Sequence, residues 1–238
     1  AAAEVASRYG RQDAVVATPG TDPAAPSPGA LGRGVAAGLL WLGRLTQAKD
    51  PLTFLDALAR VRDLEWTARL AGPDTVDPAL TARVRDRVHR AGLGGRVCVP
   101  GPLAGPGLEQ AWDGTDLLVH TSRAETYGMV VAEALARGIP ALVAAGTGAQ
   151  EALRAGAVFP PGDVETLAGT LRSWLTDGRL QERWRRDAAA GRAVQAGWDQ
   201  TAAAVWGALT SGTARGPRPP GPGARPTPRA RTRPGPAA

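Results

Sequence analysis

The 238-residue chain is 43% hydrophobic and 21% charged. Such a composition can bury the core of one or two domains, and it excludes a globally disordered or fibrous protein. The single cysteine, Cys98, excludes an intrachain disulfide framework and is typical of a reducing compartment. No apolar run approaches the roughly 20 residues that span a bilayer, and no basic-then-apolar signal is recognisable. We therefore expect a soluble, cytoplasmic protein.

The net charge of +6 comes from the C-terminal end of the sequence. Residues 212–238 contain six arginines, eight prolines and no acidic residue; without them the 28 basic residues fall to 22, which equals the 22 acidic residues. We expect this tail to be disordered with polyproline character. It can make weak contacts with RNA or with an anionic membrane, but its composition favours a solvated terminus without a specific nucleic-acid partner.

The first 34 residues are expected to form the end of a preceding domain and an interdomain linker. Residues 1–11 have a helical pattern that stops at Gly10. A short apolar strand is predicted at residues 14–18. Residues 19–34 are rich in Pro, Gly, Ser and Asp, which indicates a connecting loop.

From residue 35 onward, short apolar runs alternate with helical patterns. The apolar runs lie at residues 39–42, 68–71, 97–99, 117–120 and 141–144. The helical patterns lie at residues 51–61, 78–91, 107–112, 128–137, 149–154, 164–175, 180–190 and 201–209, and Asp163 supplies an N-cap to one of them. This alternation predicts an α/β fold with a doubly wound, Rossmann-like parallel sheet over residues 35–195. A closing helix is expected at 196–211, before the tail at 212–238.

The stretch from residue 120 to residue 140 carries the clearest chemical signal. It begins at the carboxyl end of a predicted strand, the edge where open α/β sheets bind ligands. A polar loop carries Glu125, and Gly128 opens a helix whose first amides suit an anion. Glu133 lies further along that helix. Two carboxylates with phosphate-binding amides between them suit a nucleotide-sugar, whose sugar and ribose hydroxyls donate to the acids. Taken alone, the spacing of the two glutamates favours an ordinary amphipathic helix with an exposed glutamate.

Two cations follow the predicted strand at 39–42 and are expected at the same edge of the sheet. Arg44 offers a planar fork, and Lys49, the only lysine in the sequence, offers a compact point charge. A diphosphate needs such compensating charge. Taken alone, the pair also fits solvated loop residues, but its combination with the stretch at 120–140 favours a diphosphate site.

These residues resemble the C-terminal domain of a retaining GT-B glycosyltransferase of the family 4 type. The resemblance covers residues 14–206, and its landmarks occur in the family's order. They are the segment 15–22, Gly43-Arg44-Leu45 with Lys49, Gly72-Pro73-Asp74, Arg96-Val97 with Gly101, Glu125 to Glu133, Gly138-Ile139-Pro140 and Pro161-Gly162-Asp163, with Trp198 and Trp206 resembling the closing helix.

The resemblance implies how the donor diphosphate is held. Arg44 and Lys49 correspond to the pair that grips the diphosphate, so that neither a metal nor another cofactor is needed. The backbone amides of Gly128, Met129 and Val130 correspond to those that meet the phosphates.

It also implies roles for the rest of the donor. Glu125 corresponds to the acid beside the transferred sugar, where it positions the sugar and stabilises oxocarbenium character; it is counted as catalytic with Arg44 and Lys49. Glu133 corresponds to the acid that holds the ribose, and the main chain near Leu103 to the segment that contacts the nucleobase. Tyr127 is placed among the donor-binding residues as well.

Enzymes of the family have a second, N-terminal domain that binds the acceptor. Only its last helix and strand are recognisable, within residues 1–18, so we expect the chain to supply the donor-binding half and to be incomplete for catalysis. The histidines do not fill the gap: His120 is expected to be a satisfied structural residue that can still reach the cleft, and His89 to be solvated. Cys98 is expected to be a small core residue.

The predicted function is transfer of a glycosyl group from a nucleotide-diphospho-sugar to an acceptor hydroxyl with retention. Two alternatives within the same fold are a noncatalytic nucleotide-sugar-binding module and a GT-B-type nucleotide-sugar epimerase. A nucleic-acid-binding protein acting through the tail is disfavoured by the neutral body and by the lack of an aromatic stacking platform. The sequence leaves the sugar, the nucleobase and the acceptor open.

Overall fold

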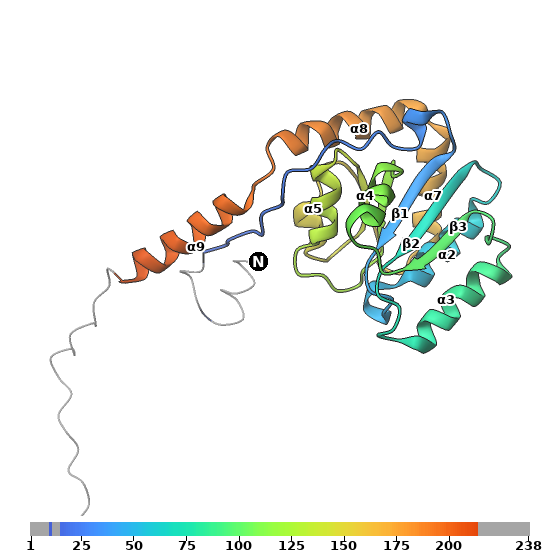
Figure 1. Ribbon diagram of the computed structural model, residues 1–238, viewed down its shortest axis with the longest axis horizontal. Helices are drawn as coiled ribbons and strands as arrows, with labels where there is room; N and C mark the ends of the chain where they lie inside the picture. The colour runs from blue at the N-terminus through green and yellow to red at the C-terminus, as the bar shows by residue number, and fades with distance from the viewer. Residues whose placement is uncertain (1–9, 11–14, 214–238) are drawn as a thin grey trace, which may run out of the picture.

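The computed structural model describes residue 10 and residues 15–213. Six strands form one sheet in the order β3-β2-β1-β4-β5-β6. Their bounds are β1 Ala37–Leu42, β2 Trp66–Ala71, β3 Val97–Gly101, β4 Leu117–His120, β5 Ala141–Ala144 and β6 Gly156–Phe159. Every pair of neighbouring strands is parallel. The chain winds outward from β1 to β3 and then crosses back to β4, which confirms the doubly wound, Rossmann-like α/β fold (Figure 1).

Helices cover both faces of the sheet. On one face lie α2 (Pro51–Arg60), α3 (Pro78–Arg90) and α7 (Val164–Thr176), and on the other lie α4 (Gly105–Asp113), α5 (Met129–Ala136) and α6 (Ala149–Ala152). The long helix α8 (Gly178–Ala193) packs against α5 and α7. Two short 3-10 turns, η1 (Leu31–Arg33) and η2 (Gln47–Lys49), flank β1, and α9 (Trp198–Thr213) projects from the body (Figure 1).

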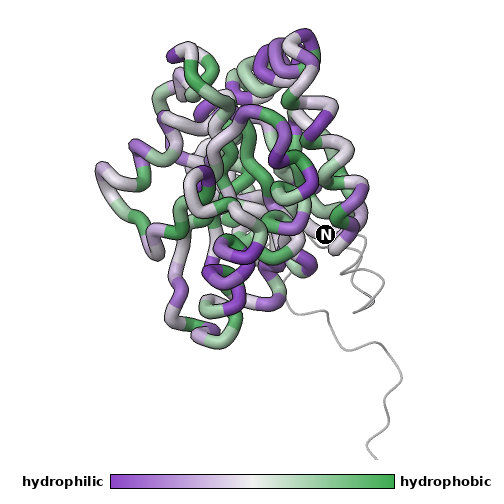
Figure 2. The backbone as a smooth tube through the Cα atoms, turned by 90° about the vertical axis from the view of Figure 1, so that its right-hand side faces the viewer, coloured by the Kyte–Doolittle hydropathy of each residue, from purple (hydrophilic) through white to green (hydrophobic). Residues whose placement is uncertain are grey.

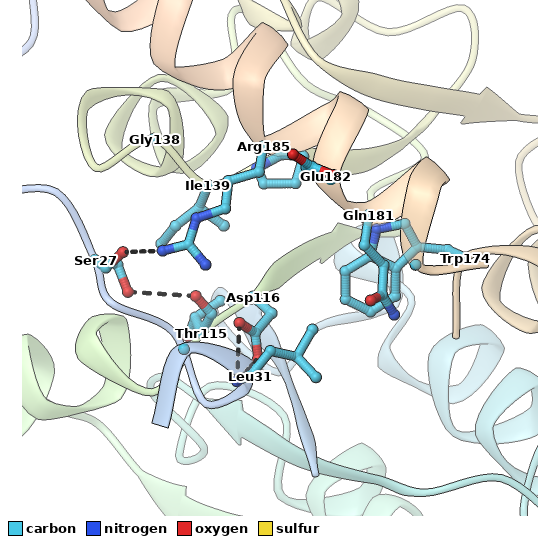
Figure 3. A pocket seen from close by; sticks show the side chains of 13 residues that line it. Ser27, Leu31, Thr115, Asp116, Gly138, Ile139, Trp174, Gln181, Glu182 and Arg185 are labelled. Atoms are coloured by element: carbon cyan, nitrogen blue, oxygen red, sulfur yellow. Dashed lines mark hydrogen bonds between the residues drawn. The ribbon is translucent and has the colours of Figure 1, made fainter. Parts of the chain in front are cut away.

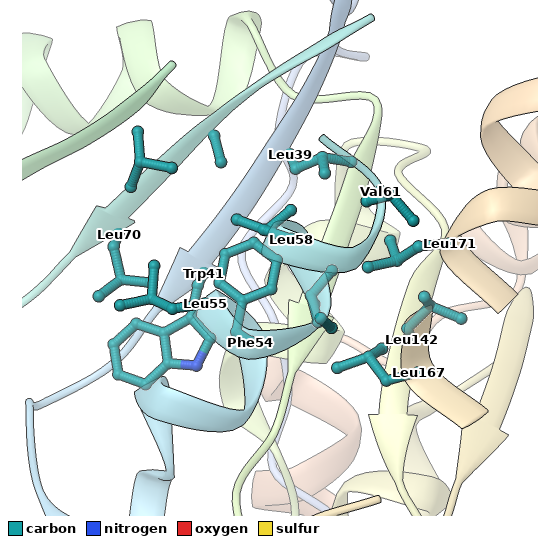
Figure 4. Close-up of a cluster of buried hydrophobic side chains, with 14 of the residues drawn as sticks. Leu39, Trp41, Phe54, Leu55, Leu58, Val61, Leu70, Leu142, Leu167 and Leu171 are labelled. Carbon is teal, nitrogen blue, oxygen red and sulfur yellow. The ribbon is translucent and has the colours of Figure 1, made fainter. Parts of the chain in front are cut away.

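The apolar runs of the central strands are buried on both sides because successive side chains point to opposite faces. Leu39 and Trp41 join the core under α2, α3 and α7, whereas Leu40 joins the core under α4, α5 and α6. Phe54 and Leu58 of α2 pack in the first of these cores (Figure 4). Hydrophobic segments accordingly run through the centre of the molecule and hydrophilic ones gather on the outer helices (Figure 2).

Aspartates begin several helices and explain where these helices start. Asp163 accepts a hydrogen bond from the Thr166 amide at 3.0 Å, which confirms the predicted N-cap. The hydrogen bond from the Thr166 hydroxyl, followed by that from the Thr166 amide, lowers the pKa of Asp163. Asp50 and Asp77 cap α2 and α3 in the same way, each followed by a proline in the first turn.

Three expectations differ from the structure. Strand β6 was not predicted, and Cys98 is exposed rather than buried because β3 is an edge strand whose Cys98 side faces solvent. Residues 15–18 form no strand; instead, the Thr201 hydroxyl donates to the Thr18 carbonyl at 2.7 Å, so this segment lies against the start of α9. The predicted N-terminal helix and the tail fall almost entirely on residues 1–9, 11–14 and 214–238, outside the described residues.

The linker before η1 runs alongside α8 and the start of α9 (Figure 1). The Thr21 amide donates to the Ala196 carbonyl at 3.2 Å. Arg192 of α8 donates to the Ala24 carbonyl at 2.8 Å. Helix α9 leaves its large apolar side chains exposed, among them Trp206 at 69%. None of the described helices is both long and apolar enough to cross a membrane.

Asp116, at the amino edge of the sheet, fastens the linker to the start of β4. Its Oδ2 accepts the amides of Ala30, Leu31 and Gly38 at 3.1, 3.1 and 2.8 Å. Burial raises the pKa of Asp116, against the opposing effect of these amides. A hollow of about 280 Å³ lies beside it, with Ser27 and Trp174 also in its wall (Figure 3).

Candidate functional site

The predicted site lies where the strand order reverses. Strands β1 and β4 are neighbours, so the loops that leave their carboxyl ends meet at one edge of the sheet. Together with the loop that follows β5, they line a hollow of about 790 Å³. Its wall includes Arg44, Lys49 and Glu125, although Arg44 and Glu125 are 81 positions apart in the sequence.

Lys49 and Glu125 form an ion pair across this hollow. The Lys49 ammonium donates to Glu125 Oε2, while Glu125 Oε1 accepts the Thr126 amide at 3.1 Å. His120 Nε2 lies 3.4 Å from the same Oε2. The contact with His120, followed by that with Lys49, lowers the pKa of Glu125 to about 2, against the opposing effect of partial burial. Glu125 is therefore an ionised carboxylate at neutral pH.

The backbone beneath Lys49 is held firmly. The Trp41 indole donates to Thr121 Oγ1 at 2.8 Å, and that hydroxyl lies 2.8 Å from the Lys49 and Asp50 carbonyl oxygens, to which it donates. Asp50 has a φ of 49°, in the left-handed region that favours glycine. Its carboxylate caps α2 and accepts Arg123 Nε at 2.7 Å. The Lys49 side chain is therefore the movable part of a fixed loop.

Arg44 is exposed and lines the hollow without an ion-pair partner among the described residues. Its guanidinium presents a fork of donors that matches phosphate oxygens. An arginine without an ion-pair partner among the described residues, next to a half-buried lysine, favours anions at this edge of the sheet.

Helix α5 begins beside the hollow at Gly128. Gly128 has a φ of 84°, and a Cβ there would lie 2.7 Å from the Ala149 Cα, so both the conformation and the packing against α6 require glycine. The first amides that bond within the helix are those of Val131 and Ala132, to the Gly128 carbonyl. The amides of Met129 and Val130 therefore have no acceptor within the helix, as expected at a helix start.

Glu133 and Met129 lie in a second, smaller hollow of about 270 Å³. Linker residues 21–24, Arg137 and Trp198 form other parts of its wall. Burial raises the pKa of Glu133, and Arg137 opposes this effect. The predicted residues are thus divided between two hollows, with Glu125 in the larger and Glu133 in the smaller.

The remaining predicted donor-binding residues pack against the core between α4 and α5. Leu103, Tyr127 and Val130 are partly buried against that cluster. Their side chains therefore belong to the packing between α4 and α5.

Sequence reasoning missed two parts of the site. The loop after β5 brings residues 146–148 into the larger hollow, and the Gly148 amide donates to the Glu125 carbonyl at 2.8 Å. The signal for it was a Gly-Thr-Gly run directly after a predicted strand. The second is the state of His120, which was expected to be a satisfied histidine able to reach the cleft; its buried Nε2 has no hydrogen-bond partner within the part of the chain that the structure describes. Over the described residues, no group of three or more His, Cys, Asp or Glu is placed to hold a metal ion.

Comparison with known proteins identifies relatives of this chain. The model of the family described as "Glycosyl transferases group 1" matches residues 37–190. A D-inositol 3-phosphate glycosyltransferase of Jonesia denitrificans is 31% identical over 172 residues, which cover 69% of this chain and 40% of the relative. A mannosylfructose-phosphate synthase of Agrobacterium fabrum is 32% identical over 157 residues, covering 62% of this chain and 35% of that protein. The chain thus spans well under half the length of these two relatives.

Solved structures share the fold. Sucrose-phosphate synthase from Thermosynechococcus elongatus superimposes with a TM-score of 0.77 at 21% identity, over 90% of this chain and 57% of that one. Anabaena HepE in complex with UDP and glucose superimposes with a TM-score of 0.68 at 25% identity, over 76% of this chain and 50% of that one. The six-stranded parallel sheet therefore matches half of a GT-B architecture.

Proposed function

The chain belongs to the glycosyl transferases group 1 family, and we propose that it binds a nucleotide-diphospho-sugar at the carboxyl ends of β1 and β4. We propose further that it acts in the transfer of the glycosyl group to an acceptor hydroxyl with retention at the anomeric carbon. The observation that carries the proposal is the convergence of Arg44, Lys49 and Glu125 on one hollow.

The diphosphate half of the donor belongs in the larger hollow. Transfer leaves a nucleoside diphosphate whose developing negative charge must be stabilised. Arg44 has no ion-pair partner among the described residues, and Lys49 can exchange its carboxylate partner for a phosphate oxygen. The amides of Met129 and Val130, which have no acceptor within α5, add the positive end of that helix beside the hollow. These groups can neutralise a diphosphate without a metal ion, which is the mode of binding that we propose.

The sugar is proposed to lie next to Glu125. A carboxylate whose pKa is lowered to about 2 stays ionised, so it can accept hydrogen bonds from sugar hydroxyls and stabilise positive charge at the anomeric carbon. The ribose is proposed to lie against Glu133, and the nucleobase against the main chain near Leu103. The complex of HepE with UDP and glucose supports uridine nucleotides as the first donors to test.

The described residues are proposed to supply the donor-binding half of the reaction. The matched region covers 40% of the Jonesia relative, and half of HepE. In a two-part transferase, much of the rate enhancement comes from holding the acceptor opposite the donor. We therefore expect the 238-residue chain to bind donor without turning over at an enzymatic rate. Incubation with labelled nucleotide-sugars and a broad acceptor panel tests this, and multiple turnover would contradict it.

Calorimetric titration with UDP and with GDP tests the binding site itself. We expect binding that persists in excess chelator, since the cations at the site belong to the protein. Arg44→Ala is expected to weaken binding by about 1–3 kcal/mol, the usual cost of removing a charged hydrogen-bond partner. Arg83→Ala, at an exposed position of α3 away from the site, is the matched control and should bind like the parent. Loss of binding on chelation would contradict the metal-free mode, and no binding of either nucleotide by the parent would contradict the proposed function.

A further inference from the structure

His120 has an unusual position for a buried histidine. Its side chain is 5% exposed, at the end of β4, and its Nε2 atom has no hydrogen-bond partner among residue 10 and residues 15–213. Buried polar atoms in folded proteins are normally paired, so an unpaired ring nitrogen calls for a specific explanation. The nearest charged group is Glu125, whose Oε2 lies 3.4 Å away, within ion-pair distance but outside hydrogen-bond geometry.

Lys49 occupies the same oxygen. Its ammonium donates to Glu125 Oε2, while the other carboxylate oxygen accepts the Thr126 amide. His120 and Lys49 therefore face one acceptor oxygen, and of the two only Lys49 donates to it with hydrogen-bond geometry.

The loop geometry allows Lys49 to leave and keeps Glu125 and His120 in place. Thr121 holds the Lys49 backbone carbonyl, and the Gly148 amide holds the Glu125 carbonyl. Only the Lys49 side chain has to move for its ammonium to meet a phosphate oxygen in the same hollow. Of the other cations that line the hollow, Arg123 is tied to Asp50 and Arg44 has no contact with Glu125 among the described residues. Glu151 lines the hollow too, but has interactions of its own.

We propose that His120 is a positioning residue that donates from Nε2 to Glu125 Oε2 when Lys49 turns to the donor diphosphate. The inference rests on the proposed function, because a diphosphate in the larger hollow is what draws Lys49 away. This handover, in which His120 replaces Lys49 as the donor to Oε2, leaves both oxygens of Glu125 with a hydrogen bond, one from the Thr126 amide and one from His120. The carboxylate then keeps its orientation toward the sugar at the stage when its lysine partner is engaged elsewhere.

The inference predicts an energetic coupling between His120 and Glu125 during nucleotide binding. His120→Leu removes the donor, so releasing Lys49 leaves Glu125 without a replacement, and UDP affinity should fall roughly tenfold. His120→Gln keeps an N–H donor on a side chain of similar reach and should stay within about threefold of the parent. In a Glu125→Gln background Lys49 has no carboxylate to leave, so His120→Leu should then change UDP affinity by less than about twofold.

The experiment is a double-mutant cycle measured by UDP titration of the parent, His120→Leu, Glu125→Gln and the double variant. Thermal unfolding of each variant checks that it is folded; should His120→Leu not fold, His120→Asn, whose amide is too short to reach Glu125, takes its place. The handover is supported if His120→Leu lowers UDP affinity in the parent but not in the Glu125→Gln background, and if His120→Gln keeps the affinity of the parent. An equal loss in both backgrounds, or no loss in either, overturns it while UDP binding by the parent still stands. Failure of the parent to bind any nucleoside diphosphate overturns the proposed function and this inference together.

Discussion

The two edges of the sheet use their polar side chains in opposite ways. At the amino edge, Asp116 accepts three backbone amides and Ser27 donates to the Trp112 carbonyl at 2.8 Å, so these groups hold the linker on the sheet. At the carboxyl edge, Arg44 has no ion-pair partner among the described residues, and His120 Nε2 has no hydrogen bond. The comparison indicates that polar groups at the amino edge are fully used in holding the fold, whereas the carboxyl edge keeps some polar groups, Arg44 and His120, that the fold itself does not use.

Removing the carboxylate at the amino edge is expected to have the largest effect. Asp116→Ala leaves three amides without an acceptor and should lower the free energy of unfolding by about 3–5 kcal/mol, as measured by urea denaturation. UDP affinity of the folded fraction should not change. Asp113→Ala, at an exposed position three residues away, is the control and should stay within about 0.5 kcal/mol of the parent. Equal stability of the Asp116 and Asp113 variants would remove the distinction between the two edges.

The glycine at the start of α5 tests how tightly the carboxyl edge is built. Gly128→Ala forces a left-handed backbone on alanine and brings its Cβ within 2.7 Å of the Ala149 Cα, which should cost about 2–4 kcal/mol of stability and weaken UDP binding. Gly138→Ala is a matched control, because Gly138 has a φ of 69° but open space around its Cβ. It should lose only about 1 kcal/mol and keep its UDP affinity. A similar loss in both variants would show that the contact with α6 is unimportant.

A conservative change at Lys49 distinguishes the effect of its charge from the effect of its shape at the carboxyl edge. Lys49→Arg keeps the charge, but the planar guanidinium is larger than the ammonium it replaces in a space shared with Glu125 and His120. UDP titration should show an affinity roughly tenfold lower, or about 1.4 kcal/mol. Arg83→Lys on α3 is the reciprocal control and should bind as the parent does. Equal affinities of Lys49→Arg and the parent would show that any cation serves at this position.

The smallest expected effect is a pH dependence that originates at Glu125. The pKa of this acid is lowered from 4.5 to about 2 in the folded protein. A lowered pKa stabilises the folded state above the unfolded value, and that contribution disappears as the pH falls toward 2. The stability advantage of the parent over Glu125→Gln should therefore shrink by about 1 kcal/mol across this range, less than the full shift because solvent reaches the hollow. Glu65→Gln, at an exposed site, should follow the parent at every pH in urea denaturation.

The sequence was sufficient to predict the central strands and the helices between them. Runs such as residues 39–42 and 117–120 are apolar on both faces, and Asp-Pro pairs mark where α2 and α3 begin. Strand β6 was missed because it is short, lies at the sheet edge, and buries only Phe159 fully. Cys98 was misjudged for the same reason, since a strand pattern does not show whether a helix covers its second face.

The sequence predicted those parts of the candidate site in which a charged side chain follows the end of a strand. It did not predict the parts in which two side chains face the same acceptor atom. Arg44, Lys49 and Glu125 could be placed at one edge because carboxyl ends of parallel strands coincide. That Lys49 and His120 share one oxygen of Glu125 depends on side-chain positions that no spacing in the sequence records. The division of Glu125 and Glu133 between two hollows likewise arises from the linker, which closes the smaller one.

The contact between the linker and the last two helices also has a consequence for folding order. Gln195 donates to the Thr21 hydroxyl across 174 positions of sequence, so this contact joins parts of the chain that are far apart in sequence. Such long-range contacts form late and open first, while the sheet stays intact. Amide hydrogens of the linker should therefore exchange with solvent well before those of β1 and β4. Because the linker forms part of the wall around Glu133, each such opening exposes the smaller hollow to solvent without disturbing the strands beneath it.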